Sequence, residues 1–413
     1  MPTTSWIQLL GGALVTGAAV VGLLSLKRSH EPLALVAALV STSFAGAGLA
    51  RVVIAYGRAE VTLLAALLAL GVVGGGFGLA SSVLTHMASR KRPVELVDEG
   101  ASLDGDPTVV VVVLACIEPE TYDPSTTARD LIDLADAGLP EAGIGITPFL
   151  YAAQKARYRA AGGRSPAAAQ ARSVTAQLQG LLGREQFPRV DLVTCNSREP
   201  LAAHVARLYR RGFRRIIVAE ASVAESFEID RAKTSVDALR PEAFGFEVAY
   251  TSPLWASDRI VNMVAARIVA STQNPSTTGV ALLMHGQPED RERTHAGFDV
   301  QENAFVNRVR MTLVERGHPE NNIRLCRTDW RPPDVTETVR HLAALGCTRI
   351  LVVPACYPFE SVSTVLDLTV AMRQARVDSH VYVTRLSAWG EDPVVAEALR
   401  SAVMVARSEL DLR

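Results

Sequence analysis

Residues 108–116 read TVVVVVLAC, and this stretch decides the fold. Apolar side chains, most of them β-branched, follow one another without the alternation of a half-exposed strand. Such a run is typical of a strand that is buried on both faces of a parallel sheet. Since both faces must then be covered, helices are expected on either side of the sheet. The stretch therefore predicts the start of an α/β domain.

Further strand-like runs follow this one and alternate with amphipathic stretches of helix length, at 190–194, 215–219, 247–251, 280–284, 323–326, 349–353 and 380–384. This alternation is the pattern of βαβ crossovers. The roughly 300 residues after the first strand suffice for two doubly wound halves of about 150 residues each. We predict two facing Rossmann-like halves, at residues 108–272 and 273–413.

An internal repeat supports two halves. Residues 205–222 (VARLYRRGFRRIIVAEAS) align without gaps with residues 339–356 (VRHLAALGCTRILVVPAC), and Gly212 matches Gly346. The shared unit is a helix, a glycine that ends it, and a strand. Unrelated units of this kind would also look alike, so an origin without duplication stays open. Ligands in such folds bind beyond the carboxyl ends of the strands, here between the halves.

The first 92 residues are different in character. Three long apolar runs, separated by short charged breaks, lie at 6–26, 32–50 and 61–85. Each has about the length, roughly 20 residues, that a helix needs to cross a bilayer. We predict three transmembrane helices in residues 1–92, then a polar linker at 93–107. Glycines at four-residue spacing, Gly71 with Gly75 and Gly74 with Gly78, are expected to let these helices approach closely.

The charged flanks predict an orientation. On one side of the spans lie Lys27, Arg28, Arg90, Lys91 and Arg92, and on the other lie Arg51, at the end of its span, and Arg58. By the positive-inside rule the five-residue side is cytoplasmic. No basic side chain occurs in the first five residues, so a cleaved signal peptide is not expected. The sequence predicts a multi-pass cell-membrane protein, with the lipid bilayer as a partner and the α/β part in the cytoplasm.

Charge and cysteine content exclude other classes. The formal net charge of −1 gives no positive field for nucleic acid as a main partner. The five cysteines, at positions 116, 195, 326, 347 and 356, lie far apart without a C-x-x-C pair. We therefore expect reduced thiols in a reducing compartment, and no iron–sulfur cluster. No phosphate-binding loop, dinucleotide fingerprint or G-x-S-x-G elbow occurs, so neither ATP, NAD nor serine-hydrolase chemistry is supported.

One imidazole stands where a ligand is expected. The strand at 280–284 ends in His285-Gly286-Gln287-Pro288, and the glycine permits a sharp turn at the strand's carboxyl end. Histidine there could bind a metal or accept a proton. The alternative is a turn histidine that bonds only to the backbone.

A second polar group follows the repeat strand at 349–353. Glu360 lies near the start of a helix expected to run to about residue 375, and Asp367 lies about two turns further on. Either carboxylate could face His285 across a cleft. Capping of the helix by Glu360 is the alternative, because a helix dipole favours a carboxylate at its amino terminus.

Three stretches carry a family resemblance. Residues 158–166 (YRAAGGRSP) are similar to the segment Y-x-x-I-G-G-x-S-P. His285 to Pro288, with residues 297–301 (GFDVQ), resembles H-[GS]-L-P followed by G-D-P-Y-x-x-Q. Trp330, with the prolines at 332 and 333, looks like W-L-x-P. With these motifs the chain resembles the ferrochelatase family from about residue 108 to 410.

The resemblance implies a porphyrin cleft between the two halves, ferrous iron as the substrate metal, and His285 as its ligand or as the acceptor of pyrrole protons. Tyr357, Trp330 and Gln287 are the residues that would contact the porphyrin. The family's second motif, F-x-S-D-H-I-E-T-L-Y-E, falls on residues 357–367 with changes. Its histidine becomes Ser361 and its key glutamate becomes Ser363. Glu360 and Asp367 would then have to supply the missing carboxylate.

The sequence thus leaves three hypotheses. The first is a membrane-anchored, ferrochelatase-like enzyme of haem biosynthesis that inserts ferrous iron into a porphyrin. The second is a non-catalytic, membrane-tethered relative that binds a tetrapyrrole or a metal, and the two changed serines favour it. The third is a structural or partner-binding module on the same fold. Association into homo-oligomers is open under all three.

Overall fold

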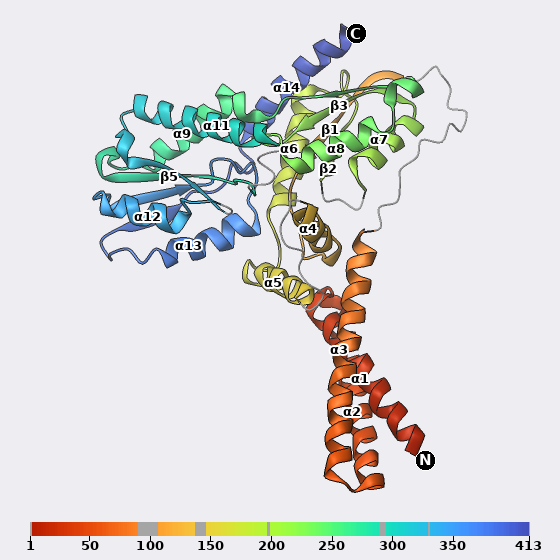
Figure 1. Cartoon of the computed structure of the whole chain (residues 1–413). Coiled ribbons are helices and arrows are strands. Elements are labelled where there is room, and N and C mark those ends of the chain that lie inside the picture. Colours follow the sequence, from red (N-terminus) through yellow and green to blue (C-terminus); the bar gives the residue numbers. More distant parts are fainter. Residues whose placement is uncertain are drawn as a thin grey trace. The chain divides into compact units, whose positions relative to one another are not determined.

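The computed structural model describes residues 2–89, 106–136, 146–195, 199–288, 295–328 and 331–412 (Figure 1). The chain groups into two compact units. One contains residues 1–92 and 121–163, and the other contains residues 93–120 and 164–413.

The first unit is built on three long helices: α1 (Pro2–Ser25), α2 (Glu31–Tyr56) and α3 (Ala59–Ser89). By length and composition each could cross a membrane, as the sequence predicts. The prediction for Arg51 is wrong, because α2 continues beyond it to Tyr56. Arg51 Nη1 donates to Gln8 Oε1 of α1 at 2.6 Å, so this charge joins two of the helices.

The close approach of these helices uses glycines other than the predicted ones. A Cβ atom at Gly17 would lie 2.0 Å from the carbonyl oxygen of Val73, and one at Gly76 would lie 2.1 Å from that of Leu14. These two glycines bring α1 and α3 into backbone contact. By contrast, Gly71, Gly74 and Gly75 border open space. Four-residue spacing places glycines on one face of a helix, but only the packing decides which face meets the neighbour.

Two shorter helices, α4 (Pro124–Asp136) and α5 (Thr147–Ala160), belong to this same unit. The Tyr122 hydroxyl donates to the carbonyl of Ser25 at 2.7 Å, and Lys155 Nζ donates to that of Leu23 at 2.8 Å. The predicted domains follow chain order and place residues 121–163 in the first half. These contacts explain why the structure groups them with the apolar helices instead. Most of the predicted linker, residues 93–105, lies outside the described residues.

The second unit contains two four-stranded parallel sheets. Their strands are β1 (Asp106–Ala115), β2 (Val190–Thr194), β3 (Phe213–Glu220), β4 (Glu247–Tyr250), β5 (Thr278–Met284), β6 (Ile323–Arg327), β7 (Arg349–Val353) and β8 (Tyr382–Arg385). All eight predicted strands are confirmed, and with them the α/β fold class. The order is β2-β1-β3-β4 in one sheet and β6-β5-β7-β8 in the other. The predicted repeat occupies corresponding places, because Gly212 and Gly346 both adopt positive φ just before β3 and β7.

Helices cover both faces of each sheet, as the run of valines requires. They are α6 (Ala167–Leu182), α7 (Leu201–Arg210), α8 (Phe227–Asp237), α9 (Asp258–Ser271), α11 (Ala296–Glu315), α12 (Val335–Ala344), α13 (Leu368–Gln374) and α14 (Pro393–Asp411). In β1, Val110 and Val112 pack into a cluster with residues of α7 and α8. Val111 and Val113 point the other way, into a core that both sheets share with α6, α9, α11 and α14.

A disulfide joins Cys116 to Cys195, with their Cα atoms 4.9 Å apart. The prediction of reduced thiols is therefore wrong for this pair. Each cysteine directly follows a strand, and Ala115 of β1 stands opposite Thr194 of β2, so the next residues meet. The other three cysteines, Cys326, Cys347 and Cys356, are buried and free.

Candidate active site

His285 begins the loop that follows β5. This strand has the same place in its sheet as β1 has in the other sheet. Every residue of β5 is buried, whereas the His285 side chain is 42% exposed. Gly286 adopts a positive φ of 75°, a backbone conformation that glycine reaches without strain. The turn therefore brings the imidazole out of the core at the edge where ligands bind in such folds.

Glu302 of α11 holds this imidazole in place, and sequence reasoning missed it. The side chain is 2% exposed. Its Oε1 lies 3.1 Å from His285 Nδ1 and accepts from the backbone N–H of His285 at 3.2 Å, and its Oε2 accepts from that of Gly286. Since a carboxylate only accepts, Nδ1 carries the hydrogen and the lone pair is on Nε2. Glu302 thus fixes both the orientation and the tautomer of His285.

A thiol contributes to the setting of Glu302. Burial, reinforced by the Glu302 carboxylate, holds the pKa of Cys356 well above its usual range. Cys356 is 1% exposed and follows β7 closely, so it remains a protonated thiol bonded to Glu302. The carboxylate is thereby engaged by the turn after β5 and by the segment after β7.

Tyr357 packs on the other side of His285. The two rings stack with their centroids 3.7 Å apart and their planes 29° apart. The Tyr357 hydroxyl lies 2.8 Å from Thr328 Oγ1, and Thr328 in turn donates to the carbonyl of His285. Tyr357 is only 6% exposed, so His285 covers the ring that the sequence assigns to porphyrin contact.

The other two predicted porphyrin contacts have different outcomes. Gln287 is 6% exposed, and its Nε2 donates to the carbonyl of His295 at 3.1 Å and to Asp299 Oδ2 at 3.0 Å. This amide therefore ties the loop after β5 to the start of α11. Trp330 lies outside the described residues.

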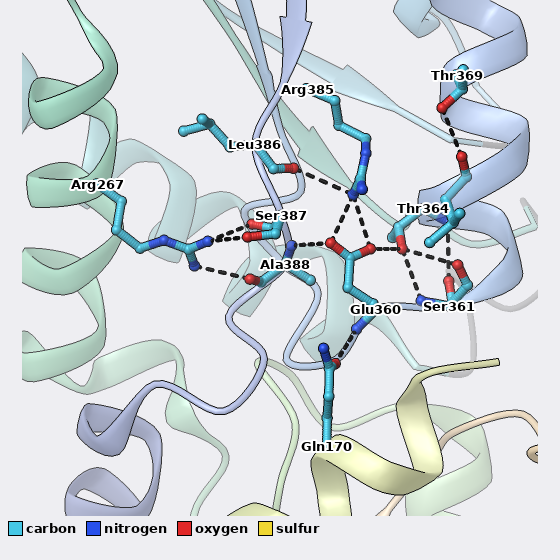
Figure 2. Close-up of polar contacts among 11 residues, drawn as sticks. Gln170, Arg267, Glu360, Ser361, Thr364, Thr369, Arg385, Leu386, Ser387 and Ala388 are labelled. Carbon is cyan, nitrogen blue, oxygen red and sulfur yellow. Dashed lines mark hydrogen bonds and ion pairs between the residues drawn. The ribbon is translucent and has the colours of Figure 1, made fainter.

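Glu360 is surrounded by hydrogen-bond partners (Figure 2). Its carboxylate accepts from Arg385 Nη1 at 2.7 and 2.9 Å, from the backbone N–H of Ala388, and from Thr364 Oγ1. Its own N–H donates to Gln170 of α6 at 2.8 Å. The residue is 6% exposed. Among the described residues, no hydrogen bond or ion pair joins Glu360 to His285, and its contacts favour a structural role.

Asp367 is half-buried and ends a π-helical turn, Ser363–Asp367, that leads into α13. Such turns often occur at functional sites. Within the described parts of the chain, no group of three His, Cys, Asp or Glu side chains is arranged to hold a metal ion.

Replacing Glu360 with Gln is expected to lower stability more than activity. The neutral amide loses the charge-assisted bonds to Arg385, each worth about 2 kcal/mol. Its NH₂ group would also face the hydrogen-bond donors that now surround the Glu360 carboxylate. The melting temperature should fall, while the metal insertion that the family resemblance implies should fall less than when His285 is replaced by Ala. Thermal melting and turnover on the same preparation check this. An unchanged melting temperature, with turnover as low as that of His285→Ala, would contradict the structural role and support Glu360 as a proton acceptor.

A buried charged group lies at the end of β3 in the other half. Glu220 is fully buried, and Lys233 Nζ of α8 lies 2.5 Å from its Oε1 and 2.6 Å from Glu225 Oε1. Burial raises the pKa of Glu220 to about 7, although Lys233 opposes the shift. The backbone N–H of Glu225 donates to Gln301 Oε1, next to Glu302. This contact joins the charged group to the helix that positions His285.

Glu220 should make stability depend on pH. Because its pKa is about 7 in the folded protein and 4.5 ordinarily, the folded state holds the proton more tightly. That stabilisation is complete below the ordinary pKa and is lost as pH rises through the folded value. Between about pH 5 and pH 8, the melting temperature of the parent should fall relative to that of Glu220→Gln. A difference that does not vary with pH would contradict the raised pKa.

Comparison with known proteins decides the family. The family model for ferrochelatase matches residues 126–407. The chain belongs to the ferrochelatase family. No curated protein matches it. Among solved structures, SirB from Bacillus subtilis with Fe3+ is 14% identical, with 75% of this chain and 98% of that chain covered and a TM-score of 0.47.

A second solved structure is the sirohydrochlorin chelatase SirB from Bacillus subtilis subspecies spizizenii in complex with cobalt. It is 13% identical, with 74% of this chain and 98% of that chain covered and a TM-score of 0.44. Family membership confirms the resemblance that the sequence motifs indicate, and with it a chelatase fold preceded by three long apolar helices. Within this ferrochelatase-family fold, His285 and Glu302 are the pair that the geometry brings together.

Proposed function

We propose that this ferrochelatase-family protein is a membrane-anchored enzyme that inserts ferrous iron into a porphyrin, as a step of haem biosynthesis. The proposal rests chiefly on the His285–Glu302 pair. Its imidazole is 42% exposed, and its Nδ1 is the nitrogen that faces Glu302. Nε2 is left for a substrate. The three long apolar helices support the choice of substrate, because an apolar macrocycle partitions into the bilayer.

The reaction replaces two pyrrolic protons of the porphyrin by one Fe²⁺ ion, so charge is conserved when both protons leave. In our proposal the His285 Nε2 lone pair accepts one of these protons, or holds the incoming iron, and the same lone pair cannot do both at once. Glu302 stabilises the imidazolium or the metal-bound imidazole through Nδ1–H. Tyr357 keeps the ring from rotating through the stacking contact.

The second proton needs another acceptor. Asp367, the other carboxylate of the predicted motif, is half-buried and remains our proposal for this role. Glu360 belongs to the proposal as the predicted partner carboxylate, but its bonds to Arg385, Thr364 and the Ala388 N–H support a positioning role for it. It would act by holding the segment from Tyr357 to Asp367 in place.

A second candidate function is a membrane-tethered relative that binds a tetrapyrrole or a metal without inserting one into the other. The contacts of Glu360 favour it. Among the described residues, both oxygens of this carboxylate accept hydrogen bonds from groups other than His285. Ser361 and Ser363, in place of the family's histidine and glutamate, favour it too.

One titration separates the two. The purified full-length protein in detergent is titrated with protoporphyrin and with coproporphyrin, and the porphyrin absorbance is followed. Ferrous iron is then added without oxygen. Conversion to the metallated spectrum in catalytic amounts supports the enzyme. Binding without conversion supports the tethered relative. No binding to either porphyrin contradicts the enzyme and any tethered relative that binds these porphyrins.

The proposed orientation places the α/β unit in the cytoplasm, since five Lys and Arg residues flank that side against two on the other. Reporter fusions at Glu60 and at Arg413 should then report opposite sides of the membrane, with Arg413 inside. At each position two reporters are fused in turn, one active only in the cytoplasm and one active only outside it, so that each result controls the other. Both fusions on one side would contradict three spans, and a cytoplasmic Glu60 would reverse the orientation.

A further inference from the structure

Helix α5 is amphipathic in the opposite sense to an ordinary surface helix. Its exposed face is apolar and follows a three-and-four residue spacing through Ile146, Phe149, Ala153, Ala156 and Ala160. Ile146 is 59% exposed and Phe149 is 57% exposed. On a helix in contact with water, polar side chains would occupy such a face.

The inward face of α5 carries the polar groups. Tyr151, Lys155 and Tyr158 are buried, at 0%, 6% and 2% exposure. Lys155 Nζ lies 2.6 Å from Glu31 and donates to the carbonyl of Leu23, so it is satisfied at the turn between α1 and α2. The Tyr158 ring packs edge-on against Tyr122. An apolar outer face with a satisfied polar inner face is the arrangement expected in contact with lipid.

One contact sets the depth of this face. The rings of Phe149 and Phe77 lie with their centroids 6.2 Å apart. Phe77 belongs to the apolar segment Ala59–Leu84 of α3, seven residues before its end. At 1.5 Å per residue this is about 10 Å inside the end of the span, a depth that still lies within the hydrocarbon layer.

We propose that α5 is an interfacial membrane helix whose first turns, Ile146 and Phe149 foremost, lie among lipid acyl chains. Towards its other end, Arg159 is 52% exposed and pairs with Glu31, and this guanidinium is placed to reach lipid headgroups. The occupant of the apolar face is thus the bilayer that the three long helices already enter. This inference stands apart from the proposed catalytic function, since it uses no residue of the candidate active site.

Spin labelling tests the depth directly. Phe149→Cys and, as a smaller change on the same face, Ala153→Cys are made in the full chain and labelled with a nitroxide without reductant. The native cysteines are buried or disulfide-bonded, and labelling of the parent gives the background. Leu70→Cys, on the exposed side of α3, is the lipid reference, and Ala344→Cys, exposed on α12, is the water reference.

In vesicles of phosphatidylcholine and phosphatidylglycerol, power saturation compares accessibility to oxygen with accessibility to a water-soluble nickel chelate. We expect the labels at 149 and 153 to favour oxygen several-fold over the chelate, as the label at 70 does. Labels that behave like the one at 344 would place α5 in water and overturn the proposal. Labels that neither reagent reaches would show a protein surface, such as a second copy, over this face, and would overturn it equally.

Discussion

His285→Ala is expected to lower the rate of metal insertion by about 10² to 10⁴, the usual effect of losing a positioned acid or base. The imidazole is the exposed member of the His285–Glu302 pair, and alanine can neither accept a pyrrole proton nor bind iron. The fold should survive, because a 42% exposed side chain in a loop contributes little to the core. Turnover and thermal melting measure these two expectations.

His341→Ala is the matched control, since His341 is an exposed histidine in the last turn of α12. It should insert metal at the parent's rate. If His285→Ala also does so, the proposed mechanism is wrong for this protein. If neither the parent nor the variant inserts metal, but the parent alone binds it, the tethered binding protein becomes the better description.

Glu302→Gln is expected to lower turnover by about 10 to 100-fold, the range found when the residue that orients a histidine is replaced. The amide keeps the size of the side chain, but its NH₂ group can face Nδ1 as a donor and reverse the tautomer, and its neutral carbonyl stabilises a cation less. The main loss should be in kcat and not in KM, because Glu302 is buried behind His285 and does not face substrate.

Two variants separate positioning from folding in this experiment. Glu360→Gln removes another buried carboxylate from the same half and should lower stability without an equal loss of kcat. Glu302→Asp keeps the charge and should recover part of the lost turnover. If Glu302→Gln and Glu360→Gln lose turnover only in proportion to their loss of stability, Glu302 has no positioning role.

The architecture of this protein could be predicted because it follows from local patterns. Eight apolar runs rich in β-branched residues became eight strands, and three runs of membrane-spanning length became three long helices. His285 could also be found, because a polar residue directly after a buried strand must lie at the carboxyl edge of the sheet. Each of these inferences needs only neighbouring residues and one physical requirement for burial.

The surroundings of His285 could not be predicted in the same way. Glu302 reads as one polar position in the helix sequence GFDVQENAF, and only the packing of α11 against β5 brings it beneath the turn. Glu360 follows β7 closely, and the sequence leaves open whether it faces His285 or caps a helix. In the structure Arg385, at the end of β8, binds it instead. The grouping of α5 with the apolar helices likewise depends on Lys155 meeting Glu31, which lies more than 100 residues earlier.

The bond between Cys116 and Cys195 gives the orientation of the membrane helices a chemical meaning. Disulfides persist in oxidising compartments and are opened by the thiol reductants of the cytosol. An α/β unit outside the cell would keep this bond as a permanent link between β1 and β2. With the unit inside, as the basic flanks predict, the Cys116–Cys195 bond would face the thiol reductants of the cytosol. The direction in which three helices insert therefore determines whether β1 and β2 are joined covalently or only by their backbone hydrogen bonds.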